Sequence, residues 1–153
     1  MNKTILLVVF CFSLFVSGYS QGIRFDSYPS HPRLLVKKGE EQKIKSDLAL
    51  NPEMLRLHNY LLGQCDDLIT TPVLAYKKEG KRLLAVSREA LRRIFYLSYA
   101  YRMTGEDKYR LRAEQEMIAV CSFTDWNPSH FLDTGEMTMA VAIGYDWLFD
   151  RLS

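Results

Sequence analysis

The side chains best suited to chemistry are gathered in one short segment, Thr124 to His130. Trp126 offers an aromatic face on which a sugar ring can stack, while Asn127 and His130 add amide and imidazole groups that can donate hydrogen bonds. The alternative is that Trp126 and His130 fill the gap between two helices and bond to backbone carbonyls, as such side chains commonly do. We treat all three residues as candidates for contact with a carbohydrate.

A second group of candidates is cationic. Four arginines follow one another along an expected helix, and guanidinium groups suit bidentate binding of carboxylate or sulfate. Arg88 and Arg92 are four residues apart and share a face, so they are the candidates for a bound acid group. The plainer alternative is that they form ion pairs with Glu89 or with acids of the next helix. The four arginines are Arg88, Arg92, Arg93 and Arg102.

No pattern of metal ligands is visible. His31 and His58 stand alone, without a second histidine, cysteine or carboxylate at metal-ligand spacing. A glycine-rich phosphate loop is also missing. The sequence therefore predicts no metal and no cofactor. We interpret the tyrosines of the arginine-bearing helix as packing residues rather than proton shuttles; they are Tyr96, Tyr99 and Tyr101.

The first twenty residues have the layout of a secretory signal peptide. Lys3 supplies the positive charge, Ile5 to Val16 is an apolar block too short to cross a bilayer comfortably, and Ser17 to Ser20 supplies small residues at the expected cleavage point. We expect export to the periplasm or secretion, with no membrane contact after cleavage. An N-terminal membrane anchor that is never cut is the alternative.

The charge balance limits the class of partner. Removal of residues 1–20 takes away Lys3 and no acid, so the net charge falls from +2 to +1. A nearly neutral chain has no broad field to attract nucleic acid, and an acidic ligand would have to be held by a local cluster of cations. Cys65 and Cys121 form either one disulfide or two inert core thiols, and we favour the thiols.

Apolar periodicity and helix-ending residues predict an extended lead-in over residues 21–37, followed by helices. Asn51 is the expected N-cap before Pro52, and Gly105 the expected C-cap of the arginine-bearing helix. The very short turn at Gly105 predicts an antiparallel αα-hairpin. Residues 70–83 form a connection long enough to touch a ligand. The five expected helices span residues 38–50, 52–69, 87–104, 106 or 107 to 121, and 133–149.

The last of these helices is the most apolar. Asp133 and Glu136 suggest a capping-box start, which argues for ordinary capping rather than anion binding there. Residues 136–149 are apolar nearly all the way round, which predicts a helix covered on several sides. The preceding helices can cover only part of it, so we expect later sequence to complete the core. Ser153 would serve as the cap of a further helix.

Several short motifs together resemble a known family. In order and spacing, they resemble the N-terminal helical domain of the heparinase II/III-like polysaccharide lyases over residues 31–153. This resemblance implies an all-α fold, in which antiparallel αα-hairpins form the first part of an incomplete (α/α) toroid. Full-length members continue into β-sandwich domains, which we expect to lie beyond residues 31–153. The motifs are His31 to Leu35, Ser87 to Arg93, Tyr99 to Gly105 and Gly144 to Leu148.

The resemblance also implies a reaction. Family members cleave uronic-acid polysaccharides such as heparin, heparan sulfate or alginate by β-elimination, using Tyr, His and Asn residues that come from beyond this stretch. No catalytic residue can be carried over to this chain, and we expect no turnover from these 153 residues alone. The expected partners are an acidic polysaccharide and the missing C-terminal part of the same protein. The alternative is a non-catalytic helical module that binds a glycan or a protein.

Overall fold

The computed structural model describes residues 28–153, and the expected signal peptide over residues 1–20 lies outside this range. The described part is all-helical, with five α-helices and no strand; one isolated antiparallel bridge joins Glu79 and Arg82. A single 3-10 turn follows the last helix. The elements are α2 (Glu41–Leu50), α3 (Pro52–Thr70), α4 (Leu84–Thr104), α5 (Asp107–Cys121), α6 (Phe131–Leu148) and η1 (Phe149–Arg151).

Local signals set two of the helix ends as the sequence predicts. The Asn51 side chain accepts hydrogen bonds from the backbone N–H groups of Glu53 and Met54, both at 3.1 Å, and so caps α3. Gly105 ends α4 in the left-handed conformation, with φ +78°, and its N–H donates to the carbonyl of Tyr101 at 2.7 Å. Both caps are confirmed because they depend only on neighbouring residues.

Three helix starts differ from the prediction, and the first of them is α2, which begins at Glu41 rather than Lys38. α4 begins at Leu84 rather than Ser87, since the buried Leu83 carbonyl already accepts from the N–H of Ser87 at 3.1 Å. α6 begins at Phe131, so the predicted capping role of Asp133 is wrong. Asp133 lies inside the first turn with no exposed surface, and its carboxylate binds residues of another segment.

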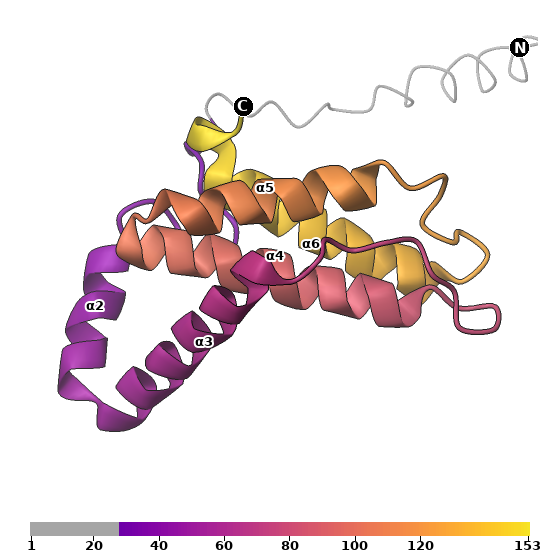
Figure 1. The fold of residues 1–153 in the computed structure, drawn as a ribbon. Coiled ribbons are helices and arrows are strands. Elements are labelled where there is room, and N and C mark those ends of the chain that lie inside the picture. Colours follow the sequence, from indigo (N-terminus) through magenta and orange to yellow (C-terminus); the bar gives the residue numbers. More distant parts are fainter. Residues whose placement is uncertain (1–27) are drawn as a thin grey trace, which may run out of the picture.

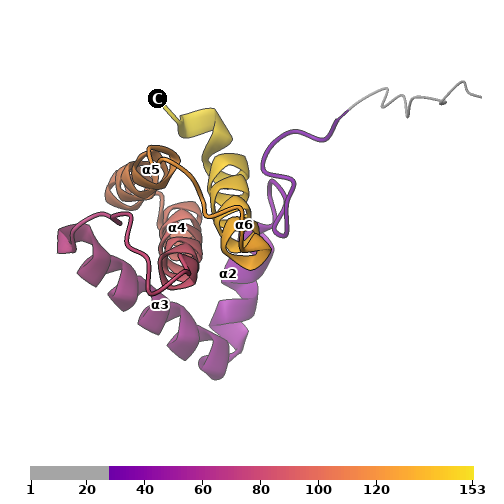
Figure 2. The same cartoon turned by 90° about the vertical axis from the view of Figure 1, so that its right-hand side faces the viewer.

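Helix α4 is the central element of the described part (Figures 1 and 2). It packs against α6 along most of its length and also contacts α5, α3 and α2. Seen end-on in Figure 2, α4 has α5, α6 and α3 around it, whereas α2 and α3 diverge from the bundle in Figure 1. The loops at residues 71–83 and 122–130 project from the same end of the bundle, opposite α2.

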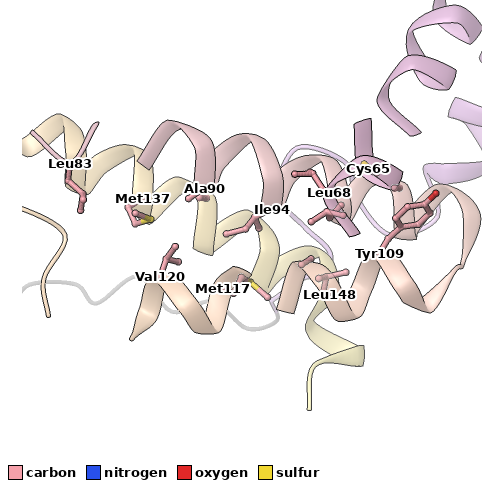
Figure 3. Packing of buried hydrophobic residues seen from close by; sticks show 14 residues of the cluster. Cys65, Leu68, Leu83, Ala90, Ile94, Tyr109, Met117, Val120, Met137 and Leu148 are labelled. Atoms are coloured by element: carbon pink, nitrogen blue, oxygen red, sulfur yellow. The ribbon is translucent and has the colours of Figure 1, made fainter. Parts of the chain in front are cut away.

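The core lies where α4, α5 and α6 meet (Figure 3). Ile94, Met117 and Met137 are buried there, each from a different helix. Gly144 permits the close approach of α6, because a Cβ atom at this position would lie 2.5 Å from Ile94 Cγ2 and 2.6 Å from Met117 Sδ. The third helix of the core could not sit this close with any larger residue at position 144.

Helix α6 is covered on one side and open on the other. Met137, Ala140 and Gly144 face the core, but Leu132, Met139 and Tyr145 are each about half exposed, at 48%, 49% and 51%. The expectation of a helix covered on several sides is therefore not met within residues 28–153. The physical reason is that α4, α5 and the segment before α2 supply partners for only one face.

The segment before α2 is a strap across the C-terminal end of α6. It has no helical structure from Tyr28 to Lys37. The buried carboxylate of Asp146 accepts hydrogen bonds from the backbone N–H groups of Arg33 and Leu34, both at 2.8 Å, and its Oδ1 lies 2.6 Å from His31 Nδ1. Trp147 Nε1 donates to the Leu34 carbonyl at 2.8 Å. These bonds hold the strap onto the helix bundle.

Candidate functional site

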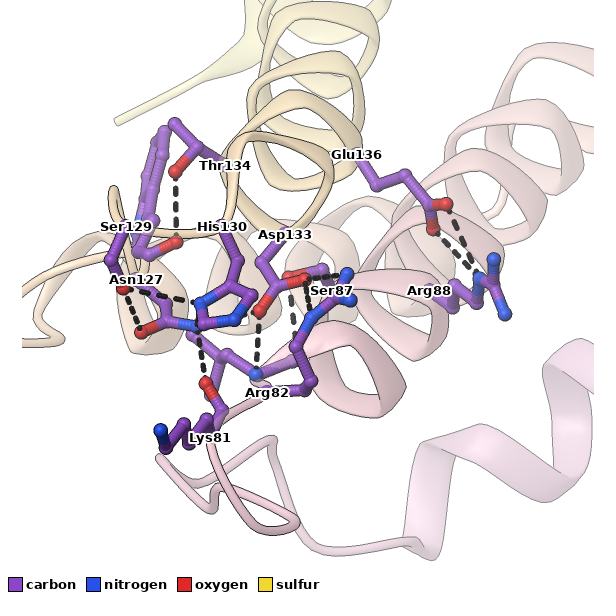
Figure 4. Close-up of polar contacts among 12 residues, drawn as sticks. Lys81, Arg82, Ser87, Arg88, Asn127, Ser129, His130, Asp133, Thr134 and Glu136 are labelled. Atoms are coloured by element: carbon purple, nitrogen blue, oxygen red, sulfur yellow. Dashed lines mark hydrogen bonds and ion pairs between the residues drawn. The ribbon is translucent and has the colours of Figure 1, made fainter.

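Asp133 organises the end of the bundle where the two long loops meet (Figure 4). Its Oδ1 accepts hydrogen bonds from Arg82 Nε at 3.0 Å and Nη2 at 2.8 Å, and its Oδ2 accepts from the Leu83 N–H at 2.7 Å. The Arg82 guanidinium, the Asn127 amide and this N–H together hold the pKa of Asp133 far below its usual range, against the opposing effect of burial. The carboxylate is thus a fixed anion that joins α6 to the loop before α4.

Asn127 is a structural residue of this network rather than a free donor. Its amide nitrogen donates to Asp133 Oδ2 at 2.7 Å and to the Lys81 carbonyl at 2.9 Å. The residue is 2% exposed, and its backbone φ of +58° is uncommon for a residue other than glycine. Sequence reasoning placed Asn127 against a substrate, but its polar atoms are already used within the protein.

Trp126 is directed inward as well. Its Nε1 donates to the Val120 carbonyl at 2.8 Å, and its partly buried ring packs against the core. Thr134 Oγ1 donates to the Trp126 carbonyl at 2.9 Å, which ties this residue to α6. Trp126 therefore fills the space between the loop and the helices and bonds to a backbone carbonyl, which is the alternative to sugar stacking given above.

His130 keeps a free edge at the same end. Its Nδ1 lies 3.1 Å from Ser129 Oγ and 3.4 Å from Asn127 Nδ2, so the network fixes the orientation of the ring. Within residues 28–153 no hydrogen bond involves Nε2, and the side chain is only half-buried. A ring held on one nitrogen with the other available is the arrangement that proton transfer or hydrogen bonding to a ligand requires.

The two candidate arginines, Arg88 and Arg92, have different partners and different positions along α4. Arg88 lies near this end of α4, is 61% exposed, and pairs with Glu136 at 3.2 Å. Arg92 is one turn further along, where it forms two hydrogen bonds to Glu89 and lies over the Tyr96 ring. The guanidinium groups of Arg92 and Arg93 lower the pKa of Glu89. Arg88 is therefore the more exposed of the two and lies nearer this end, although within residues 28–153 no contact joins it to His130.

The other two arginines of α4 bind the protein itself. Arg93 joins Glu89 to the buried Glu116 of α5, and its Nη1 also donates to the Pro72 carbonyl. Arg102 pairs with Glu41 and donates to the carbonyls of Val36 and Lys37. Its guanidinium lies 4.7 Å from the ring centroid of Trp147, which places it under the strap.

Sequence reasoning missed the basic residues that border this site. Lys77, Lys78 and Lys81 are exposed, and Arg82 is the partner of Asp133. The signal was present in the sequence, because residues 77–82 carry four cations and one acid around Gly80. Only the tertiary contacts bring this turn beside residues 125–130, through the bond from Asn127 to the Lys81 carbonyl.

Two cavities lie away from this end. A cavity of about 350 Å³ between α2, α3 and α4 contains a histidine and a tyrosine, His58 and Tyr99, whose Nδ1 and hydroxyl are 2.9 Å apart. Its other walls are apolar and contain no cation to neutralise an acid group, so it does not suit an acidic sugar. The second cavity, about 280 Å³, lies beneath the strap and is lined by Arg102, Asp146 and neighbouring residues.

Among residues 28–153, no three side chains of His, Cys, Asp or Glu gather closely enough to hold a metal ion. None of the helices in this range has the length and apolar character needed to cross a membrane. Cys65 and Cys121 are free thiols, the first buried and the second exposed. The comparisons with known proteins add no assignment: no family model matches the sequence, and no curated protein matches it either.

Proposed function

We propose that this chain is the N-terminal part of an exported polysaccharide lyase, which cleaves uronic-acid-containing polysaccharides by β-elimination. The observation that carries the proposal is the end of the bundle organised by Asp133. There a buried anion holds two loops together, and the ring of His130 is oriented through Nδ1 while no hydrogen bond within residues 28–153 involves Nε2. An oriented imidazole at an end of the bundle that also carries exposed cations suits an acidic sugar.

The proposed architecture is the first part of an (α/α) toroid built from antiparallel αα-hairpins. The exposed part of α6 supports it, because Leu132, Met139 and Tyr145 are half-exposed apolar side chains that a further helix would cover. The two-residue connection between α4 and α5 supports a hairpin of these helices. The proposal also includes the start of the toroid domain at residue 38, after the extended lead-in, and a β-sandwich domain after the toroid.

The proposed reaction requires that the charge of the uronate carboxylate be neutralised. A base removes the proton from the ring carbon next to the uronate carboxylate. The electron pair forms a carbon–carbon double bond, and the glycosidic oxygen leaves and takes up a proton. The proton becomes acidic enough only if the carboxylate charge is neutralised by donors in the site. His130, and the exposed Arg88 once it exchanges Glu136 for the substrate, are the residues of this chain proposed to approach that carboxylate, whereas the base and the acid belong to the rest of the protein.

The test uses the protein encoded by the complete reading frame. It is incubated with heparan sulfate, chondroitin sulfate and alginate, and the ultraviolet absorbance of unsaturated uronate ends is followed. We expect absorbance to rise with at least one polymer, and the substitution His130→Ala to lower the rate. No absorbance with any of the three polymers would discard the lyase function and favour a non-catalytic binding module.

A further inference from the structure

The turn at residues 76–82 concentrates positive charge on the surface. Lys77, Lys78 and Lys81 are exposed, and the only acid of the turn is Glu79. Arg82 forms an ion pair with Asp133, and Arg88 forms one with Glu136. Within residues 28–153 no comparable ion pair involves any of the three lysines. Their charges are therefore available to an external ligand.

The turn is held in a defined position. The backbone N–H of Glu79 donates to the Arg82 carbonyl at 2.8 Å, and the N–H of Arg82 donates back to Glu79 at 3.1 Å. Gly80 provides the required φ of +59°. The bond from Asn127 to the Lys81 carbonyl fastens the turn to the neighbouring loop. A backbone fixed in this way loses little entropy when a ligand binds to its side chains.

The turn also carries an aromatic side chain. The hydroxyl of Tyr76 donates to Asp125 Oδ1 at 3.0 Å, and the Tyr76 ring meets Phe123 edge-on. Lys78 Nζ lies 5.6 Å from the centroid of the same ring. Asp125 also accepts from the N–H of Asn127 at 2.7 Å, which fixes its position, but these neutral donors leave its negative charge in place near Lys78. Lys77, Lys78 and Lys81 therefore exceed the two acids Glu79 and Asp125 by one positive charge.

We infer that Lys77, Lys78 and Lys81 form a lysine edge that binds the sulfate or carboxylate groups of an acidic polysaccharide. The inference rests on the proposed function and adds a subsite to it. Asn127 connects the lysine edge to His130. Its amide nitrogen donates to the Lys81 carbonyl and lies 3.4 Å from His130 Nδ1. Figure 4 shows the Lys81 side chain extending away from the Asp133 network, toward solvent.

Lysine suits this task physically. Its ammonium group is a compact charge with three donors on a flexible stem, so it can follow acid groups that differ in position along a polymer. Binding by several lysines releases counterions from a polyanion, and its strength falls as salt rises. The lysine edge would hold sugar units outside the reacting bond, with a contribution to binding but not to the chemical step.

The test compares two triple variants of equal charge. K77Q/K78Q/K81Q removes the lysine edge, and K37Q/K43Q/K45Q removes three lysines on or beside α2, at the opposite end of the bundle in Figure 1. The dissociation constants of the full chain are measured for fluorescent heparin and alginate oligosaccharides over a series of salt concentrations. Neutral dextran and single-stranded DNA of similar length serve as comparison polymers. Unchanged melting temperatures establish that both variants fold.

We expect the edge variant to weaken binding at least about tenfold and to flatten the salt dependence, since each lysine near a polyanion contributes several-fold. The control should change binding less than about threefold. The dissociation constants for heparin and for alginate are compared to determine whether sulfate or carboxylate groups are preferred. Equal weakening by both variants, or no weakening by the edge variant, overturns the inference. DNA binding as strong as heparin binding also overturns it.

The outcome is separate from that of the proposed function, because binding is measured without turnover. In the complete protein, the edge variant should raise KM for the cleaved polymer and leave kcat unchanged, the result expected for contacts made equally before and during reaction. Absence of any turnover would end the lyase proposal without affecting the measured binding. A fall in kcat with unchanged KM would contradict the assignment of the lysine edge as a binding subsite.

Discussion

Arg82 and Asp133 form a bidentate contact across 51 positions of sequence. The Nε and Nη2 atoms of Arg82 donate to a single carboxylate oxygen, at 3.0 and 2.8 Å, while the other oxygen receives the N–H of Leu83 and the amide of Asn127. The carboxylate has no exposed surface. Four hydrogen bonds from two loops therefore meet at one buried group, and the geometry of this end of the bundle depends on it.

Asp133→Asn should destabilise the fold by about 2–4 kcal/mol. The NH2 group of asparagine would face the N–H donors that now bind the carboxylate, so these buried donors would lose their acceptor. The change is measured by urea unfolding. Asp150→Asn is the matched control, since Asp150 is 60% exposed and pairs with Lys38 at 3.6 Å; it should change stability by less than about 0.5 kcal/mol. Equal effects from the two substitutions would mean that burial of Asp133 is unimportant.

Acid should weaken the fold through the same residue. The folded pKa of Asp133 is lowered, so its contribution is complete above the unfolded value of about 3.9 and is lost as pH falls below that value toward the folded pKa. We expect the stability advantage of the wild type over Asp133→Asn to shrink between pH 5 and pH 2, as followed by urea unfolding at each pH. An advantage that stays constant would contradict this linkage.

Gly144→Ala should destabilise by about 1–3 kcal/mol, because the added methyl meets Ile94 and Met117. Met117 is flexible and can give way, but the β-branched Ile94 cannot do so easily. Gly135→Ala in the same helix is the control. Its Cβ would approach only Phe131 at 4.0 Å, and alanine favours helix, so it should stabilise by up to about 1 kcal/mol. Thermal unfolding of both variants checks the contrast.

Glu116→Gln should cost about 3–5 kcal/mol, because Glu116 is fully buried and accepts from Arg93, Arg112 and the Leu74 N–H. The buried guanidinium of Arg112 would lose its counter-charge, and Arg93 would keep only Glu89. The control Glu53→Gln breaks an exposed pair with Arg56 and should cost less than about 0.5 kcal/mol. Similar melting temperatures for the two variants would disprove the central role of the Glu116 cluster.

The two thiols should differ in reactivity. Burial raises the pKa of Cys65 to about 12, while Cys121 is exposed and its pKa is raised less. In the folded protein at pH 8, iodoacetamide should label Cys121 first, and Cys65 only after unfolding in denaturant. Peptide mass spectrometry gives the extent at each site. Fast labelling of Cys65 without denaturant would contradict its burial in the core.

Much of the local structure could be predicted from the sequence. The caps at Asn51 and Gly105 and the existence of all five described helices follow from periodicity and from residues adjacent to each end. The start of α6 was predicted wrongly, because Asp133 and Glu136 have the spacing of a capping box. A capping pattern cannot reveal that Arg82, far away in sequence, competes for the same carboxylate.

The candidate site was predicted in part. Sequence patterns pointed to residues 124–130 and to Arg88, and His130 and Arg88 do lie at one end of the bundle (Figure 4). They could not tell that Asn127 and Trp126 use their polar atoms on Lys81, Asp133 and Val120. Whether a side chain is free for a ligand depends on partners that folding brings close, and those contacts leave no periodic mark in the sequence.

The sequence by itself determined where the chain is helical, because caps, proline, glycine and apolar spacing act over a few neighbouring residues. The tertiary structure decided what those helices present. It made α4 central, left apolar side chains of α6 exposed, and fastened the lysine turn to Asn127. The reason is physical: burial and hydrogen bonding at Asp133 and Gly144 arise between segments that are distant along the chain and meet only when the helices pack.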